Sequence, residues 1–369
     1  MLRTTIAFGI LVALMVGAEA SEIERDERVV FFHTCGWFDA ETQTWQVPIH
    51  GWIFEPEEAS RKRAFVRRLF QRKMSLDPAG PERARYKARA SAFLVDNEEG
   101  KEVQIVLGGR AYKMEESGEN GHFFGKLSLS PAEADQLAVP GAGPSRWLSY
   151  SALTRPGDQR VFAGHVALVE PEGFSVISDI DDTIKISNVR DQQMLLRNTF
   201  LRRFEPVPGM AELYKGWATA GAAFHYVSGS PWQLYVPMAE FHERSGFPRG
   251  SFHMRPFRLR DARNREVWSS PDELKRLAVE PLLESYPGRH FICVGDSGER
   301  DPEIYGSLAR RFPDRIRAVC IRNVSGESAD DVRYARAFEG VSRDRWRLFD
   351  DPAELAGLIE PPLQRVSSQ

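Results

Sequence analysis

Two aspartates separated by one residue follow a short apolar segment near the middle of the chain. The segment FSVIS at 174–178 predicts a buried strand, and DIDDT follows it at 179–183. Because residues i and i+2 of an extended chain point to the same side, Asp179 and Asp181 can converge where this strand ends. Paired carboxylates repel each other unless a cation neutralises them, and their hard oxygens suit Mg²⁺. Acidic residues that only end a strand and open a turn are the alternative for this motif taken alone.

Two other segments place polar groups at the ends of apolar strands. HFICVGDSGERD at 290–301 carries Asp296 and Asp301 in a glycine-containing loop. Ser228 and Gly229 end the strand-like segment AAFHYVSGS, and a helix is predicted to start directly after it. The hydroxyl of Ser228 and the backbone N–H of Gly229 therefore predict a cradle for an anion.

Lys275 stands near the start of another predicted helix. SPDE at 270–273 combines an N-cap serine, a proline at the first helical position and a capping-box glutamate. A cation in the first turns is not favoured by the helix dipole, so this position favours a role for the amine in a site. A solvated surface lysine is the alternative.

The elements that position these residues alternate between strand and helix after residue 171. This alternation predicts a parallel sheet covered on both faces, and open sheets of this kind bind ligands at the carboxyl ends of their strands. The predicted strands are 174–180, 222–230, 251–257, 290–298 and 315–323, and the predicted helices are 210–221, 231–246, 271–287 and 350–360.

Before residue 170 short β-like segments predominate. They predict a mainly-β, sandwich-like domain at 21–170, interrupted by one helical insertion, ahead of an α/β domain at 171–360 and a tail at 361–369. The β-like segments are 28–35, 46–54, 86–96, 102–109, 122–130, 146–153 and 160–170.

Composition excludes several classes of protein. The net charge of −3 excludes a basic footprint over the whole protein, so no nucleic-acid partner is expected. Mean hydropathy of −0.39 excludes a polytopic membrane protein. With 3 cysteines in 369 residues, a disulfide-built scaffold is excluded. Cys293 and Cys320 lie in predicted buried strands, where inert thiols are expected rather than a disulfide.

The first 20 residues are typical of a secretory signal peptide. Arg3 precedes an uncharged apolar stretch from Ile6 to Ala18, and Ala18 and Ala20 offer small residues for cleavage after Ala20. The apolar stretch is short for a membrane span, which makes an uncleaved anchor the lesser alternative. The mature chain is therefore expected to be exported, to the periplasm or outside the cell.

The ordered set of motifs resembles the haloacid dehalogenase superfamily of phosphohydrolases, and the segments DIDDTIK, YVSGSPWQLY and FICVGDSGERDPEIY resemble the catalytic-domain family of the yeast actin-patch phosphatidate phosphatase. HGWIFEP in the N-terminal half is also similar to that family. The resemblance implies a Rossmann-like domain with a minimal cap. It further implies a Mg²⁺-dependent phosphatase that converts phosphatidate to diacylglycerol or acts on a related phospholipid.

The resemblance also implies roles for individual residues. Asp179 would attack phosphorus to form an aspartyl-phosphate, and Asp181 would act as general acid and then base. Thr183 would hold the loop and orient Asp181, while Lys275 would offset charge on the nucleophile and the phosphoryl group. Asp182 is interpreted as part of the turn.

Phosphate and metal binding follow from the same match. Ser228 and Gly229, together with Lys275, would bind phosphoryl oxygens. Asp301 would act through water or by orienting Lys275. The residues implied in Mg²⁺ binding are Asp179, Asp181 through its backbone carbonyl, Asp296 and Asp301.

The spacing between motifs bears on the substrate. About 45 residues separate Thr183 from Ser228, which leaves little room for a large cap and favours a bulky substrate such as a lipid headgroup. The basic amphipathic segment 61–74 predicts a helix that either contacts an anionic membrane or packs its apolar stripe on the β-rich domain. Alternatives are a phosphatase of soluble phosphoesters or phosphoproteins, and a catalytically weak secreted module that binds lipid.

Overall fold

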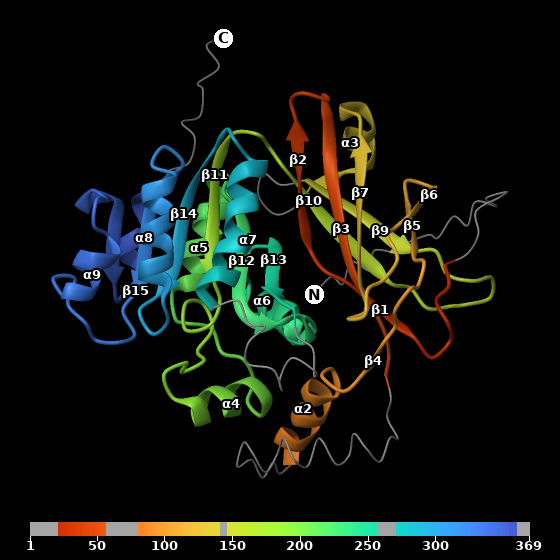
Figure 1. Cartoon of the computed structure of the whole chain (residues 1–369), viewed down its shortest axis with the longest axis horizontal. Helices are drawn as coiled ribbons and strands as arrows, with labels where there is room; N and C mark the ends of the chain where they lie inside the picture. The colour runs from red at the N-terminus through yellow and green to blue at the C-terminus, as the bar shows by residue number, and fades with distance from the viewer. Residues whose placement is uncertain (1–20, 57–79, 141–145, 257–270, 360–369) are drawn as a thin grey trace, which may run out of the picture.

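The chain forms two β-sheets that lie beside each other, with most of the helices around the second sheet (Figure 1). The computed structural model describes residues 21–56, 80–140, 146–256 and 271–359. The predicted signal peptide, the basic helix at 61–74 and the tail lie outside these residues. In the described part of the chain, no helix has both the length and the apolar character needed to cross a membrane.

The first half of the chain is rich in β-strands, as predicted. Most of the strand pairs in its sheet are antiparallel. Its main path runs β1-β3-β2-β10-β9-β5-β6, with β4 and β7 beside β3 and β8 beside β9. The long strand β3 contacts four other strands and so ties this sheet together. The elements of this half are β1 (Arg28–Phe31), β2 (Thr34–Asp39), β3 (Thr44–Glu55), α2 (Gly80–Ser91), β4 (Asp96–Asn97), β5 (Gln104–Leu107), β6 (Arg110–Lys113), β7 (His122–Leu129), α3 (Pro131–Leu137), β8 (Val139–Pro140), β9 (Arg146–Ala152) and β10 (Ala163–Val169).

The strand predicted at 86–96 is wrong, because helix α2 occupies most of it. Ala, Arg and Lys dominate this segment and favour a helix. Tyr86, Arg89 and Ala90 are its buried residues, at the i, i+3, i+4 spacing of one helix face. The apolar alternation that suggested a strand comes from Phe93 and Val95, which lie beyond the helix.

The second sheet is parallel throughout its described strands, in the order β13-β12-β11-β14-β15-β16. This confirms the mixed α/β class and the parallel sheet predicted after residue 171. The elements are β11 (Gly173–Asp179), α4 (Gln192–Phe200), α5 (Met210–Thr219), β12 (Ala223–Pro231), η1 (Trp232–Leu234), α6 (Tyr235–Ser245), β13 (Ser251–Arg255), α7 (Pro271–Ser285), β14 (Arg289–Asp296), α8 (Asp301–Arg311), β15 (Ile316–Arg322), α9 (Val332–Ala337), η4 (Arg343–Arg345), β16 (Trp346–Phe349) and η5 (Pro352–Leu358).

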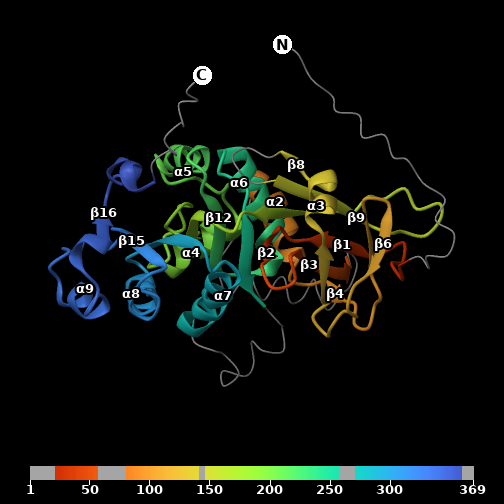
Figure 2. The same cartoon turned by 90° about the horizontal axis from the view of Figure 1, so that it is seen from above.

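Helices cover both faces of the parallel sheet, with α5 and α6 on one side and α7 and α8 on the other (Figure 2). Each face has its own apolar core, because successive strand residues point to opposite sides. In β14, Ile292 and Val294 contribute to the core under α5 and α6. Phe291 and Cys293 contribute to the core under α7 and α8. The last predicted helix is a 3₁₀-helix, η5, with a capping box at its start.

The three cysteines are free and buried. Cys293 and Cys320 lie on neighbouring strands, but Cys320 belongs to the core on the α5 side and Cys293 to the core on the opposite face. Because the sheet separates their side chains, these two thiols cannot form a disulfide without rebuilding the strand register. Both are inert core residues, as predicted.

The two sheets are joined by aromatic packing. The rings of Phe32 and Trp232 have centroids 4.2 Å apart. The hydroxyl of Tyr235 accepts a hydrogen bond from the backbone N–H of His33 at 3.0 Å. Phe32 and Trp52 from the first half belong to the same apolar core as Trp232 from the second half. The first sheet is therefore fixed against the end of the second sheet at which β12 leads into α6.

Two histidines lie in this joint. Nε2 of His50 and Nδ1 of His122 are 2.9 Å apart, so one imidazole donates and the other accepts. Burial holds the pKa of His50 well below its usual value and lowers the pKa of His122 to about 4. In the unfolded chain both side chains would titrate near their ordinary value of about 6.5. Both imidazoles are therefore neutral in the folded protein over a range of pH in which the same side chains of the unfolded chain are protonated.

We expect the free energy of unfolding to fall as pH drops from about 6.5 towards 4, at up to about 1.4 kcal/mol per pH unit for each histidine. The stability that the two histidines contribute is fully present at a pH above their pKa in the unfolded chain. It is lost as the pH falls towards their pKa in the folded protein. Urea unfolding at a series of pH values measures this slope. The double variant His50→Gln/His122→Gln should give a shallower slope, and an unchanged slope would contradict the assignment.

Candidate functional site

The carboxyl ends of three neighbouring parallel strands meet at one edge of the second sheet. Strand β11 ends at Asp179 and β14 ends at Asp296, while β12 reaches the same level at Ser228. Since β11 lies between β12 and β14, the three segments predicted to carry chemistry are brought together by strand order. Lys275 enters from α7, which packs against this sheet.

Asp179 is a buried carboxylate that lies beside an ammonium group. Its side chain is 1% exposed, and neither carboxylate oxygen accepts a hydrogen bond from the described residues. Nζ of Lys275 lies 2.7 Å from Oδ1, so its neighbour is an opposite charge. Burial raises the pKa of Asp179 well above its usual value although the Lys275 charge opposes this. An unsolvated carboxylate held beside one ammonium group has the properties of a nucleophile.

Lys275 contacts three carboxylates, of which Glu299 is the most distant, with its Oε2 3.7 Å from Nζ. Besides Asp179, its amine donates to Oδ1 of Asp301, which also accepts the backbone N–H of Asp296 through Oδ2 at 3.1 Å. Burial works against the charged amine, but Asp179 and Asp301 outweigh it and hold the pKa of Lys275 well above its usual value. This contact is compatible with an orienting role of Asp301 on Lys275, which stays a prediction. A Cβ at position 295 would lie 2.2 Å from Asp301 Oδ2, so Gly295 lets that carboxylate approach.

Asp181 faces a different set of partners from Asp179. Nζ of Lys185 lies 2.7 Å from its Oδ1, and the hydroxyl of Ser187 donates to the same oxygen at 2.7 Å. Its Oδ2 accepts from Ser228 at 3.1 Å and from Ser230 at 3.0 Å. Burial raises its pKa, but Lys185 and these hydroxyls prevail and bring the pKa to about 2. The two aspartates thus occupy electrostatically distinct halves of the site.

A tight loop after β11 turns Asp181 towards these partners. Asp182 has a positive φ of 55°. Its carboxylate accepts the backbone N–H groups of Ser187, Asn188 and Val189 at 2.8, 2.8 and 2.6 Å. Asp182 therefore stabilises the turn, as interpreted from the sequence. Thr183 is fully buried, and its hydroxyl has no hydrogen-bond partner among the described residues, so its orienting role stays a prediction.

Three carboxylates form a group that could hold a cation. Asp179, Asp296 and Glu299 each offer one oxygen, and these oxygens lie within 4.8 Å of one another. Oδ1 of Asp296 accepts the N–H groups of Gly298 and Glu299, whereas its Oδ2 has no partner in the described part of the chain. Burial, followed by the charge of Asp301, raises the pKa of Asp296 to about 8. Unpartnered hard oxygens that repel one another fit a divalent cation such as Mg²⁺.

The backbone of Gly229, which is predicted to bind phosphate, is open to its surroundings. A Cβ added at Gly229 would meet no atom within 4 Å, so this backbone borders free space. Oγ of Ser228 accepts the N–H of Ser230 at 3.0 Å while it donates to Asp181. The hydrogen bonds of Ser228 thus hold the loop in place, and the backbone of Gly229 stays accessible.

Sequence reasoning missed three members of this site. Glu299 belongs to the carboxylate group in place of Asp301, and Lys185 and Ser230 hold Asp181. Each was visible beside a recognised motif, since Lys185 stands in DIDDTIK, Ser230 in VSGS and Glu299 in GDSGERD. Side-chain direction, which spacing alone does not give, separates them from their neighbours.

Other residues singled out in the sequence have structural roles. His225 is fully buried and shares a hydrogen bond of 2.8 Å with Ser251, so it is a core histidine with a polar partner. Trp232 and Tyr235 are 6% and 4% exposed and pack in the core. Of the basic stretch after SFHM, Arg255 ends β13. The other three arginines, Arg258, Arg260 and Arg263, lie outside the described residues.

Comparison with known proteins places this region in a family. Residues 174–323 match the model for the catalytic domain of phosphatidate phosphatase APP1. Phosphatidate phosphatase APP1 of Saccharomyces cerevisiae is 33% identical over 166 residues, which cover 44% of this chain and 28% of that protein. An uncharacterized protein of Schizosaccharomyces pombe is 28% identical over 172 residues, which cover 46% of this chain and 28% of that protein.

The alignments span little more than a quarter of the length of these fungal relatives. Among solved structures, a chain of the Pnkp1/Rnl/Hen1 complex matches with a TM-score of 0.31 and 16% identity, over 41% of this chain and 46% of that chain. That likeness is too weak to assign a fold. The family match instead covers the strands and loops that carry Asp179, Ser228, Lys275 and Asp296. Over residues 174–323, the chain is therefore similar to the catalytic domain of phosphatidate phosphatase APP1.

Proposed function

We propose that this chain is a Mg²⁺-dependent phosphatase that removes the phosphate of phosphatidate or a related phospholipid through an aspartyl-phosphate. The observation that carries the proposal is the buried Asp179 carboxylate, 2.7 Å from Nζ of Lys275 and within the carboxylate group of Asp296 and Glu299. The substrate class rests on the family match and on the activity for which the yeast relative is named. A haloacid dehalogenase-type fold for 171–360 is part of the same proposal.

In the first step an oxygen of Asp179 forms a bond to phosphorus, and the bond from phosphorus to the ester oxygen breaks. Asp181, on the Ser228 side, supplies the proton that the leaving alkoxide requires. Because its pKa is about 2 in the substrate-free protein, Asp181 must take up this proton when the anionic substrate binds. In the second step water attacks phosphorus, its proton passes to Asp181, and the bond to Asp179 breaks to release inorganic phosphate. Ser228 and the N–H of Gly229 bind phosphoryl oxygens, and Lys275 offsets charge on them.

A divalent cation would be held by Asp179, Asp296 and Glu299, whose oxygens fit it. When bound, it would neutralise negative charge on the phosphoryl group and its neighbours. Asp181 contributes no side-chain oxygen to this set, because both of its oxygens already have partners. Its backbone carbonyl remains the predicted contribution from that residue.

Glu299 and Asp301 are expected to respond differently to neutralisation. Glu299→Gln should raise the Mg²⁺ concentration needed for half-maximal turnover, because it removes one member of the carboxylate group. Asp301→Asn should lower kcat at saturating Mg²⁺ and leave that concentration nearly unchanged, because Asp301 acts on Lys275. Magnesium titrations of both variants check this. The reverse pattern would return Asp301 to the metal and exclude Glu299.

The remaining proposals concern organisation and location. We propose a β-rich domain at 21–170 that packs against the catalytic domain, supported by the separate sheets on either side of residue 171. Export, with cleavage after Ala20, is supported by the apolar run and the small residues before that position. Peripheral contact of the segment 61–74 with an anionic membrane is proposed from its charge and periodicity.

The function is tested by phosphate release from a substrate panel, with protein that lacks residues 1–20. The panel contains phosphatidate in mixed micelles, a phosphoprotein, a sugar phosphate, a nucleotide and a simple aryl phosphate. We expect release from phosphatidate that stops when EDTA removes the metal. Robust release from a small ester without release from lipid would replace the lipid with a soluble substrate. No release from any substrate with Mg²⁺ would contradict the proposal.

A further inference from the structure

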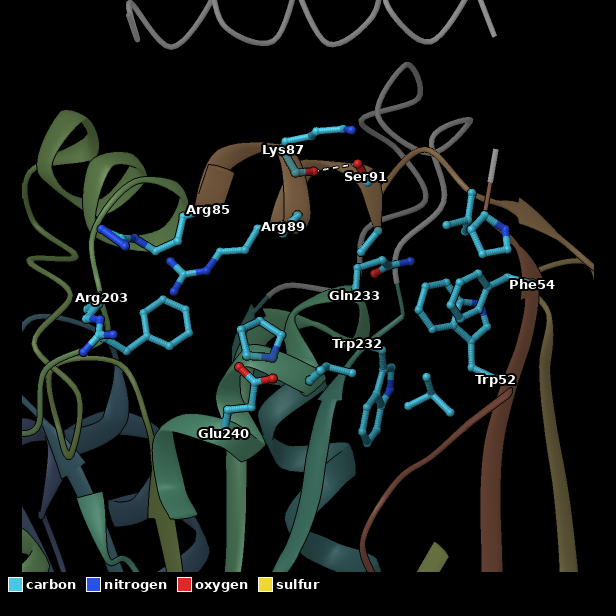
Figure 3. Close-up of a pocket in the computed structure, with 18 of the residues that line it drawn as sticks. Trp52, Phe54, Arg85, Lys87, Arg89, Ser91, Arg203, Trp232, Gln233 and Glu240 are labelled. Carbon is cyan, nitrogen blue, oxygen red and sulfur yellow. Dashed lines mark hydrogen bonds between the residues drawn. The ribbon is translucent and has the colours of Figure 1, made fainter. Parts of the chain in front are cut away.

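A cavity of about 560 Å³ lies beside the site, between the first sheet, helix α2 and the start of α6 (Figure 3). Its volume is within the range of about 300–1,000 Å³ that small-molecule sites occupy. None of the residues assigned to phosphoryl transfer or to the cation lines it. It forms only where the two halves of the chain meet, because β3 and α2 supply one wall and α6 another.

One end of the cavity is apolar. Trp52 and Phe54 stack with ring centroids 4.0 Å apart, and Trp232 faces them across the cavity in Figure 3. Val30 and Val236 also line it, and Val236 is 46% exposed although it stands beside this aromatic wall. The exposed side chain of Val236, together with the buried rings of Trp52 and Trp232, favours a hydrocarbon occupant over an ionic one at this end.

The other end is cationic. Figure 3 shows Arg85, Arg89 and Arg203 gathered on the side away from the tryptophans. Lys87 and Arg244 also line the cavity, and Glu240 is the single carboxylate of the lining. Within the described ranges, no ion pair joins any of these five cations to a carboxylate. Among the residues that the structure describes, positive charge therefore exceeds negative charge at this end of the cavity.

Two of these cations, Arg85 and Arg89, are held in place by the protein. Arg89 donates to the carbonyls of Thr199 and Arg202 at 2.5 and 2.9 Å, and its guanidinium lies 3.8 Å from the centroid of the Phe204 ring. Arg85 donates to the carbonyl of Leu201 at 2.6 Å. Guanidinium groups fixed beside an apolar wall bind an anionic group at a lower entropic cost than mobile side chains would.

We propose that this cavity binds one acyl chain that carries an anionic head group, with the chain along Trp52 and Trp232 and the anion at Arg85 and Arg203. The site is separate from the phosphoryl-transfer site and does not depend on its activity. The two are neighbours, because Trp232 follows Ser228 by a few residues and the Phe204 ring lies 4.8 Å from Nζ of Lys185. An occupant would thus contact walls that also support Asp181.

The test is calorimetric titration of the full chain with laurate, below the concentration at which it forms micelles. Laurate carries a chain and a carboxylate but no phosphate ester, so turnover cannot confuse the result. Dodecyl maltoside supplies the chain without the charge, and acetate supplies the charge without the chain. We expect saturable binding of laurate and binding of the other two that is weaker by on the order of tenfold or more.

Variants locate the binding. Arg85→Glu/Arg203→Glu and Val236→Trp should each weaken laurate by on the order of tenfold, the first by removing the anion partners and the second by filling the apolar end. Lys126→Glu/Arg336→Glu makes the same change of charge on exposed residues outside the lining and should bind normally. Thermal unfolding shows that each variant is folded. Equal affinity in all variants, or equal affinity for dodecyl maltoside, would overturn the proposal.

Discussion

Replacement of Asp179 by asparagine is expected to reduce phosphate release about 10⁴-fold or more, the scale seen when other covalent catalysts lose their nucleophile. The amide oxygen that remains is too weak a nucleophile to attack phosphorus at a useful rate. Burial already disfavours the charged form of this carboxylate, as its raised pKa indicates. The neutral variant should therefore be at least as stable to heat as the parent protein.

The matched control is Asp182→Asn, which makes the same chemical change three residues away. Asparagine tolerates the positive φ at this position and can still accept N–H groups from the loop. Turnover of Asp182→Asn should stay far above that of Asp179→Asn. Phosphate release that persists in Asp179→Asn, or an equal loss in both variants, would exclude Asp179 as the nucleophile.

The parallel sheet and the convergence of its motifs could be predicted because both depend on features that a sequence displays directly. Apolar runs of strand length ended at Asp179, Ser228 and Asp296, and parallel strands bring their carboxyl ends to one edge. Motif order alone therefore indicated which side chains would meet. The same reasoning assigned Asp182 to the turn.

What could not be predicted depends on side-chain direction. Asp301 and Glu299 are two residues apart, and spacing did not show that Asp301 turns to Lys275 while Glu299 joins Asp179 and Asp296. Lys185 follows Asp181 by four residues in a loop, where no regular period fixes where it points. A loop built by hydrogen bonds to one carboxylate has no signature in hydrophobic pattern.

Long-range packing was equally hidden. The cavity between Trp52 and Trp232 joins residues far apart in the chain, and nothing in either segment alone indicates that they face each other. The helix α2 was mistaken for a strand because its apolar stripe is short and continues into an irregular segment. Both errors arise where tertiary contacts, rather than local pattern, decide the structure.

Asp296→Asn is expected to raise the Mg²⁺ concentration for half-maximal turnover by at least about 100-fold, since even the outer partners of metal ligands contribute about 10- to 100-fold to affinity. The substitution is suited to the local structure. Oδ1 accepts the N–H groups of Gly298 and Glu299, and the amide oxygen can keep both bonds. The other oxygen has no partner among the described residues and is the atom left for a cation.

A direct measurement separates binding from turnover, because Mn²⁺ titrated into the substrate-free protein can be followed by electron paramagnetic resonance. Asp296→Asn should bind Mn²⁺ more weakly by the same factor, whereas the exposed Asp314→Asn should bind it normally. Burial and the charge of Asp301 raise the pKa of Asp296 to about 8, so neutralising this residue relieves repulsion and should not lower the melting temperature. Unchanged Mn²⁺ affinity in a folded Asp296→Asn variant would place the cation elsewhere. The group of three carboxylates would then be a source of electrostatic repulsion rather than a metal site.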